Sequence, residues 1–254
     1  MAAFATGEHR WIGNLGNLRN AVRQEVIARQ LADHVGDGAT VLDVGCGQGT
    51  QALRLAARGC RVTGVEPSAD LRALASADAD AARLELELVA GGIDDLDELL
   101  GERTFDAVCA HGLLMYLPDR TAAVRSLAGR VAPGGRLSIT VRNGHALAFR
   151  PGLRGDWAGA LAALEGPDYV NEIGVSARAD RLSDVEADLD GVGLGVVAWY
   201  GVRVLNDAVP VDQQPPADDD ELGLLLEAED RVGRLDPYRW MASQLHVVAA
   251  RGEA

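Results

Sequence analysis

The sequence predicts an α/β fold built on a doubly wound, largely parallel sheet. Short apolar runs alternate with segments of helical periodicity between residues 41 and 141. A glycine-rich turn follows the first of these runs. The chain has 254 residues, of which 48% are hydrophobic, enough for one α/β domain with a large core.

The first 37 residues predict an N-terminal helical cap followed by a helix. Segment 11–18 is rich in turn-forming residues, with two glycines and two asparagines. Apolar residues then recur at helical spacing between positions 18 and 34, and Gly36-Asp37-Gly38 ends the helix.

Five strands are expected next, at residues 41–44, 61–66, 85–90, 105–110 and 136–141. Helices are expected at 51–57, from Pro67-Ser68 onward, and at 119–131. Pro133-Gly134-Gly135 predicts a tight turn before the fifth strand. We interpret the less regular segment 143–183 as a substrate-side insertion. The remaining elements are expected to be a helix at 182–190, a strand at 195–205, a helix at 222–232 and a strand at 245–250. These add up to seven strands in a single domain spanning 1–254, with no internal repeats.

Composition narrows the function. The formal net charge is −14 and the chain contains no lysine, which excludes Schiff-base chemistry and a P-loop lysine. This acidity argues against broad, non-specific nucleic-acid binding but leaves room for a local arginine-lined site. The three cysteines form no metal-binding pattern and suit a reducing compartment. With no signal peptide in Met1–Arg10 and no membrane-length apolar run, we expect a cytoplasmic protein without a metal site or membrane partner.

The segment Val41–Thr50 carries the main functional signal. A buried strand runs into glycines at positions 45, 47 and 49, and a helix follows. Glycine permits positive φ and close approach of a ligand to the backbone, and the helix N-terminus favours a carboxylate. Asp43, at the end of this strand, can accept hydrogen bonds from a ligand ammonium or hydroxyl. Glu66 ends the next strand, where an acid can bind both ribose hydroxyls.

This pattern favours S-adenosylmethionine (SAM) over a nicotinamide dinucleotide. The glycine spacing is GxGxG rather than GxGxxG. An acid precedes the first glycine by two residues, and a whole helix precedes the glycine-rich strand.

VLDVGCGQGT resembles motif I of the class I SAM-dependent methyltransferases, which have a Rossmann-like seven-stranded sheet. The resemblance covers about residues 38–142, including Gly-Gly-Ile93-Asp94, Ala110-His111-Gly-Leu-Leu-Met115 and the turn at 133–135. It implies that Asp43, Gly45 and Gly47 line the methionine end of SAM, that Glu66 binds the ribose, that Asp94 lies beside the adenine amino group, and that His111 passes near the methyl group. We include the neighbouring Cys46, Pro67 and Ile93 among the expected cofactor contacts.

The flanking segments resemble a narrower family, the bacterial methyltransferases that esterify 5-carboxymethoxyuridine in tRNA. The resemblance rests on Gly16-Asn-Leu18-Arg19, Asn143-Gly-His145-Ala-Leu147, Tyr200-Gly-Val-Arg203-Val, Asp236-Pro-Tyr238 and the stretch 245–251. It implies that Arg19 contacts the SAM carboxylate and that Tyr200 and Arg203 lie on the substrate side. One departure is that this chain has acidic residues around 165–172, where the family member compared carries a lysine-rich run.

The acceptor determines which residues have a chemical role. A carboxylate is ionised at neutral pH and needs no general base, but a cation must orient it, and Arg203 is the candidate. A hydroxyl or amine would need a base, for which His111 and His145 are candidates. Tyr200 could hydrogen-bond either acceptor. The leading hypothesis is a carboxylate methyltransferase acting on modified tRNA. The alternatives are a small-molecule O-methyltransferase acting on an acidic or hydroxylated metabolite and a non-catalytic SAM-binding protein.

Overall fold

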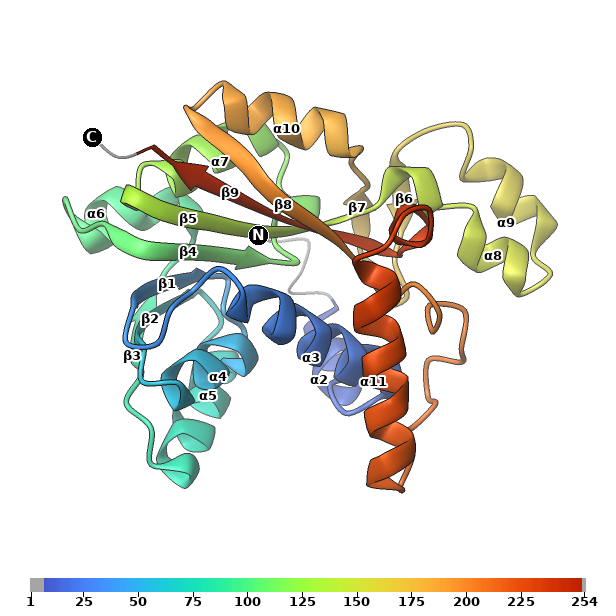
Figure 1. Ribbon diagram of the computed structural model, residues 1–254, viewed down its shortest axis with the longest axis horizontal. Helices are drawn as coiled ribbons and strands as arrows, with labels where there is room; N and C mark the ends of the chain where they lie inside the picture. Colours follow the sequence, from blue (N-terminus) through green and yellow to red (C-terminus); the bar gives the residue numbers. More distant parts are fainter. Residues whose placement is uncertain (1–6, 253–254) are drawn as a thin grey trace. The chain divides into compact units, whose positions relative to one another are not determined.

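The computed structural model describes residues 7–252, and their main feature is a seven-stranded sheet (Figure 1). The strand order is β3-β2-β1-β4-β5-β9-β8, and β6 and β7 form a separate antiparallel hairpin. The strands are β1 (Thr40–Val44), β2 (Arg61–Glu66), β3 (Glu87–Ala90), β4 (Phe105–His111), β5 (Val131–Arg142), β6 (Asp168–Val170), β7 (Ser176–Arg178), β8 (Leu194–Val202) and β9 (Gln244–Arg251). Strands β1 to β5 pair in parallel. The predicted α/β, Rossmann-like seven-stranded sheet is thus confirmed, whereas Met1–Thr6 of the predicted cap lie outside the described residues.

Helices separate the parallel strands, as expected. They are α2 (Glu8–Gly13), α3 (Leu18–Ala32), α4 (Thr50–Ala57), α5 (Ala69–Ala82), α6 (Leu96–Leu100), α7 (Arg120–Ala128), α8 (Phe149–Leu153), α9 (Trp157–Ala162), α10 (Leu182–Asp190) and α11 (Asp219–Gly233), with 3-10 turns η1 (Ile93–Asp95), η2 (Leu114–Tyr116), η3 (Gly144–Ala146) and η4 (Tyr238–Met241). Ser68 caps α5 by accepting a hydrogen bond from the Leu71 amide at 3.2 Å. Among the described residues, no helix is long and apolar enough to cross a membrane.

The predicted start of the fifth strand was wrong. Strand β5 begins at Val131, so Pro133-Gly134-Gly135 lies inside the strand rather than before it. The pairing of β5 with β4 shifts register between Phe105 and Ala107. This shift accommodates the Pro-Gly-Gly segment within the strand. A Cβ atom on Gly135 would lie 2.8 Å from the Ala132 carbonyl oxygen, so this irregularity requires glycine. Helix α7 correspondingly ends at Ala128 instead of Val131.

The chain divides into two compact units. The core unit comprises Leu31–Thr140, Glu186–Ala198 and Val247–Ala254. The flanking unit comprises Met1–Gln30, Val141–Val185 and Trp199–His246. The expectation that all 254 residues form a single domain stays a prediction.

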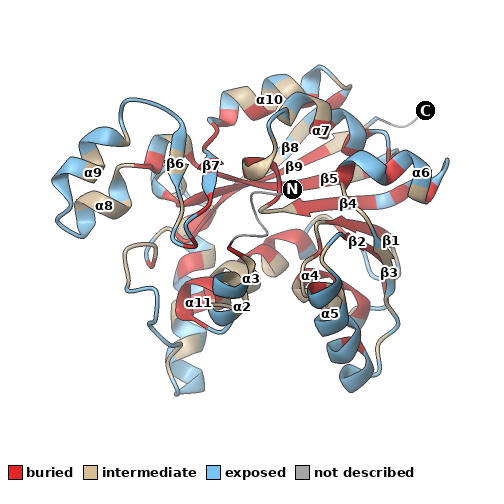
Figure 2. Cartoon of the chain, turned by 180° about the vertical axis from the view of Figure 1, so that it is seen from behind, coloured by how far each residue is buried: buried red, intermediate tan, exposed pale blue. Residues whose placement is uncertain are grey.

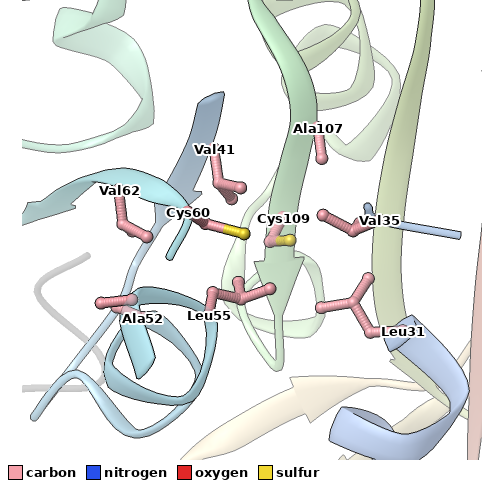
Figure 3. Close-up of a cluster of buried hydrophobic side chains, with 10 residues drawn as sticks. Leu31, Val35, Val41, Ala52, Leu55, Cys60, Val62, Ala107 and Cys109 are labelled. Atoms are coloured by element: carbon pink, nitrogen blue, oxygen red, sulfur yellow. The ribbon is translucent and has the colours of Figure 1, made fainter. Parts of the chain in front are cut away.

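Each unit has a hydrophobic cluster of its own. In the core unit, Leu55 of α4 packs with Val41 of β1, and Cys60 and Cys109 lie in the same cluster (Figure 3). In the flanking unit, the apolar face of α3 packs against Val202 of β8 and Leu226 of α11. The strands of the sheet are largely buried, whereas the outer face of α5 is exposed (Figure 2). The helical periodicity of the sequence therefore marks the buried faces.

A close contact between β2 and the glycine-rich loop explains a glycine in the middle of a buried strand. Gly64 pairs with Asp43 of β1 on one side and Leu88 of β3 on the other. A Cβ atom at position 64 would lie 2.8 Å from Cys46 Sγ and 3.2 Å from Leu88 Cδ2. The Cys46 side chain thus occupies the space above Gly64, and its packing helps to fix the loop that follows β1.

We predict that Gly64→Ala lowers the free energy of unfolding by about 1–3 kcal/mol, because the added methyl overpacks this contact. The backbone of Gly64 does not have a positive φ, so alanine fits its conformation and only the steric contact opposes it. The double variant Gly64→Ala/Cys46→Ala should recover most of the loss. Denaturant unfolding measures both effects, and additive losses in the double variant would contradict the contact. Gly195→Ala in β8 is the control, because a Cβ atom there meets nothing within 4 Å.

Candidate functional site

In the core unit, the carboxyl ends of β1, β2 and β4 mark a topological switch point. From β1 the chain builds β2 and β3 on one side and then places β4 on the other side of β1 (Figure 1). Asp43 of β1 pairs with Gly64 of β2 and with Cys109 of β4. In open α/β sheets, ligands bind outside the carboxyl ends of strands at such a point. The glycine-rich loop 45–49 begins there.

The conformation of this loop requires its three glycines. Gly45, Gly47 and Gly49 have φ angles of 70°, 57° and 79°, in the region that side chains disfavour. The Gly45 amide donates to the Val65 carbonyl oxygen at 2.8 Å, which ties the loop to β2. A Cβ atom on Gly47 would meet nothing within 4 Å. The backbone at Gly47 is therefore held in place and open to a ligand.

Two acids flank the loop in different ways. Burial, with a further contribution from Glu66, raises the pKa of Asp43 to about 7. The Glu66 carboxylate accepts hydrogen bonds from the Gly47 amide at 3.0 Å and the Ser68 amide at 2.9 Å. Asp43 is thus a buried acid that a cationic group would stabilise in its ionised form, whereas Glu66 is oriented by backbone amides.

The other residues expected to contact the cofactor occupy varied positions in the core unit. The Cys46 side chain packs over Gly64, so only its backbone remains available for a contact at the loop surface. Pro67 is exposed between β2 and α5. In η1, Ile93 is buried and Asp94 is exposed. His111 ends β4, and its Nε2 atom lies 2.8 Å from Ser138 Oγ.

In the flanking unit, four buried or largely buried arginines and one exposed arginine gather around two carboxylates. We call these residues, Arg19, Arg142, Arg150, Arg154 and Arg203, the arginine cluster. Asp207 lies at its centre. Arg150 binds both of its carboxylate oxygens, at 2.8 and 2.7 Å, and Arg203 Nη2 lies 3.0 Å from Asp207 Oδ1. Arg142 Nη1 is 3.5 Å from Asp207 Oδ2.

Glu172 and Ser243 connect the remaining members of the cluster. Glu172 pairs with Arg19, with Arg150 at 3.4 Å and with Arg154 at 3.0 Å. The Ser243 hydroxyl oxygen accepts from Arg142 and from Arg203, the latter at 2.8 Å. The insertion after β5, the segment after β8 and the start of β9 therefore meet at one network of charged hydrogen bonds.

Positive charge exceeds negative charge in this network, with five guanidinium groups, of which that of Arg154 is exposed, against the carboxylates of Asp207, Glu172 and Glu229, the last of which interacts with Arg203. The Nε atoms of Arg19, Arg142 and Arg203 are buried and make no hydrogen bond within the described residues. Burial, opposed by Asp207 but reinforced by neighbouring arginines, lowers the pKa of Arg203 to about 9. Buried charge without a counter-charge is costly, so an anionic ligand would stabilise the cluster.

Glu229 of α11 shapes the loop that carries Arg203 and Asp207. Its carboxylate is buried and accepts hydrogen bonds from three consecutive amides, those of Val204, Leu205 and Asn206, at 2.8, 3.1 and 2.8 Å. Because these amides bind Glu229 rather than a neighbouring strand, β8 ends at Val202 and not at the predicted Leu205. Arg203 itself has a φ of 58°, which a non-glycine residue adopts only under strong local constraint.

The structure brings together some of the residues singled out from the sequence. Arg19 and Arg203 both belong to the arginine cluster. Tyr200 is buried, and its ring centroid lies 5.7 Å from that of His246, which hydrogen-bonds Gln30. Sequence reasoning missed several members of the network: Arg142, Arg150, Arg154, Glu172, Asp207, Glu229 and Ser243. The spacing of Asp207 four residues after Arg203 was the one available signal, but such pairs are common on protein surfaces.

Comparison with known proteins agrees with the cofactor signal. Residues 41–135 match the family model described as a methyltransferase domain. Over 248 residues, the chain is 27% identical to the tRNA 5-carboxymethoxyuridine methyltransferase of Escherichia coli K12, covering 94% of this chain and 90% of that protein. It is 33% identical over 152 residues to a ubiquinone biosynthesis O-methyltransferase of Xanthomonas axonopodis, covering 58% of this chain and 62% of the relative.

The fold has relatives among solved structures. Magnesium protoporphyrin IX methyltransferase from Synechocystis, solved with S-adenosylhomocysteine, superposes with a TM-score of 0.64 at 17% identity, covering 97% of this chain and 95% of that one. At this identity the likeness shows the fold. The sheet order, the glycine-rich loop with its flanking acids and the sequence matches together support a SAM-dependent methyltransferase, with residues 41–135 matching a methyltransferase domain.

Proposed function

We propose that SAM binds at the glycine-rich loop of the core unit, with Asp43 and Glu66 as its principal acidic contacts. Two observations support this fit. The backbone at Gly47 is open, and Asp43 is a buried carboxylate that gains from a cationic partner. In this proposal Asp43 faces the amino-acid end of SAM, and the Glu66 carboxylate accepts hydrogen bonds from the ribose hydroxyls. Asp94, exposed in η1, would lie beside the adenine.

We further propose that the acceptor is a carboxylate and that the arginine cluster orients it. The excess of buried guanidinium groups over carboxylates is the single observation that carries this proposal. Arginine offers planar, bidentate donors that match a carboxylate, and the unused Nε donor of Arg203 is one such group. Arg19 was expected at the carboxylate of SAM, and that role stays a prediction.

The chemistry requires little from the protein beyond positioning. SAM supplies an electrophilic methyl group on its sulfonium, and an ionised carboxylate oxygen attacks without losing a proton. In-line positioning of the acceptor and exclusion of water are then the remaining requirements of the reaction. His111 need not act as a base on this route. With a hydroxyl acceptor His111 would be the candidate base, although its Nε2 lies within hydrogen-bond distance of Ser138.

We propose a carboxymethoxyuridine of tRNA as the acceptor, with an acidic or hydroxylated small molecule as the second candidate. Likeness to the Escherichia coli enzyme over 94% of the chain supports the first. The shorter match to ubiquinone biosynthesis O-methyltransferases supports the second. The arginine cluster favours an acceptor that carries a carboxylate, whether a nucleotide or a small acid, over one that offers only a hydroxyl. A SAM-binding protein without catalytic turnover would not require an anion-binding site for an acceptor.

We predict that Arg203→Ala raises the KM for a carboxylate acceptor by at least about tenfold, because a charge-assisted hydrogen bond is lost. The dissociation constant for SAM should stay unchanged. Arg203→Lys should restore little of the effect, since lysine lacks the planar fork. Steady-state kinetics and calorimetry measure these quantities, and Arg231→Ala, on an exposed part of α11, is the matched control. Wild-type kinetics for Arg203→Ala would exclude the proposed role.

The affinity for SAM should increase with pH through neutrality. Asp43 has a pKa of about 7 in the free protein, so at lower pH a bound ammonium must first displace its proton. We expect the dissociation constant to fall as the pH rises from about 5.5 to 8, by up to about tenfold per unit below the pKa. Calorimetry in buffers of different ionisation enthalpy should detect proton release on binding.

Asp43→Asn tests this assignment. It should bind SAM more weakly at pH 8 and lose the pH dependence, because asparagine does not titrate. A wild-type slope retained in Asp43→Asn would assign the titration to another group. The same raised pKa means that Asp43 stabilises the ligand-free fold at low pH and that this contribution disappears as the pH rises through about 7. Thermal unfolding of the wild type and of Asp43→Asn at pH values on both sides of about 7 gives an independent readout.

A further inference from the structure

Four side chains of the flanking unit form a cluster of ring contacts that has no role in the proposed function. The Arg239 guanidinium carbon lies 3.8 Å from the ring centroid of Trp199. The rings of Trp199 and Trp240 have centroids 4.6 Å apart, and His145 meets Trp240 edge-on at 6.1 Å. We call Arg239, Trp199, Trp240 and His145 the aromatic platform.

The platform is held in place by its surroundings. Arg239 forms a two-point ion pair with Asp236, at 2.7 and 2.8 Å, and donates to the Trp199 carbonyl oxygen at 3.1 Å. Asn143 donates to the Trp240 carbonyl oxygen at 2.9 Å. The 3-10 turn η4 carries Arg239 and Trp240, and Ala242 follows it directly. This segment packs on β8, because a Cβ atom on Gly201 would lie 2.7 Å from that of Ala242. A rigid aromatic surface loses little entropy when a ligand stacks on it.

Trp240 remains 40% exposed even though Trp199 covers part of it. Indole rings are usually well buried, so a fixed and exposed one is a candidate contact surface. A planar, electron-rich ring favours another flat ring, and every nucleobase has a face that can stack.

The platform and the arginine cluster are linked twice by short pieces of chain. Arg142, the last residue of β5, belongs to the cluster, and His145, three residues later, belongs to the platform. In the segment leading into β9, Trp240 belongs to the platform and Ser243, three residues later, accepts from the cluster. Three residues span at most about 10 Å, so each link keeps the two features within the reach of one nucleotide. The Asn143 amide also donates to the Ser243 carbonyl oxygen at 3.0 Å, which joins the two segments.

We propose that the base of a nucleotide acceptor stacks on Trp240 while the anionic group of that nucleotide enters the arginine cluster. This inference rests on the proposed carboxylate-directed function and specifies its substrate class as an unpaired nucleobase in RNA. Stacking supplies the recognition that an acidic, lysine-free chain cannot obtain from phosphates along a duplex. The arginine cluster then selects the base that carries a carboxylate.

The test uses two short single-stranded RNAs of the same sequence, one containing 5-carboxymethoxyuridine and the other uridine. Calorimetry gives their affinities for the full-length protein with S-adenosylhomocysteine present. Trp240→Ala should weaken binding of both RNAs by roughly 5- to 100-fold, the range for loss of one stacked base. Trp240→Phe should restore most of the affinity. Trp157→Ala is the matched control, because Trp157 is 70% exposed on α9 and lies outside the platform. The affinity for the cofactor product should be the same in all variants.

The outcomes separate this inference from the proposed function. Unchanged RNA affinity in Trp240→Ala, an equal loss in Trp157→Ala, or no measurable binding of either RNA to the wild type would overturn the stacking site. A carboxylate-directed methyltransferase for small acids would survive those results. Arg203→Ala should weaken the carboxymethoxyuridine RNA more than the uridine RNA. If the carboxylate makes no difference to affinity or turnover while Trp240→Ala still weakens binding, the proposed function fails and the stacking site stands.

Discussion

The flanking unit depends on a single carboxylate, that of Asp207. Arg142, Arg150 and Arg203 all converge on it, and without it their buried charges would repel one another. Burial alone would raise the pKa of Asp207, yet Arg203 and Arg150 hold that pKa well below its ordinary value. The residue therefore stays ionised, and it fixes the insertion, the end of β8 and the start of β9 in one arrangement. Glu229 supports it by binding the three amides that precede it along the chain.

Asp43 and Asp207 occupy opposite environments, and the contrast explains what each region would bind. Asp43 has Glu66 as its charged neighbour, so its carboxylate lacks a cation and its pKa rises to about 7. Asp207 is surrounded by guanidinium groups in excess. A region with surplus negative charge suits a cationic ligand, and a region with surplus positive charge suits an anionic one. This pairing matches a sulfonium methyl donor and a carboxylate acceptor, which is why the two proposals support each other although they rest on separate residues.

The sequence predicted the regions where structure follows from local rules. The strand-glycine-helix pattern at 41–57 and the strand at 61–66 were found because buried strands and positive-φ glycines leave a periodic signature. The start of β5 was missed because Pro133-Gly134-Gly135 is a typical turn signal, and only pairing with β4 turns it into an irregular part of a strand. The arginine cluster could not be predicted as a whole. Its members come from positions 19 to 243, and nothing local in Glu172 or Ser243 indicates that they meet Arg19 and Arg203.

The acidity of the chain argues against broad, non-specific nucleic-acid binding, but it is compatible with the proposed RNA acceptor. Net charge governs long-range attraction to the phosphate backbone, whereas recognition of one base depends on contacts within a few ångströms. At short range the flanking unit offers five arginines and an exposed, rigid indole. Solvated acidic side chains elsewhere would discourage non-specific binding of nucleic acid without weakening those local contacts, because salt screens charges separated by more than about 8 Å. For an enzyme that modifies a single nucleotide, acidic residues away from the site reduce non-specific binding, and stacking and ion pairing at the site supply most of the binding energy. This combination would increase selectivity.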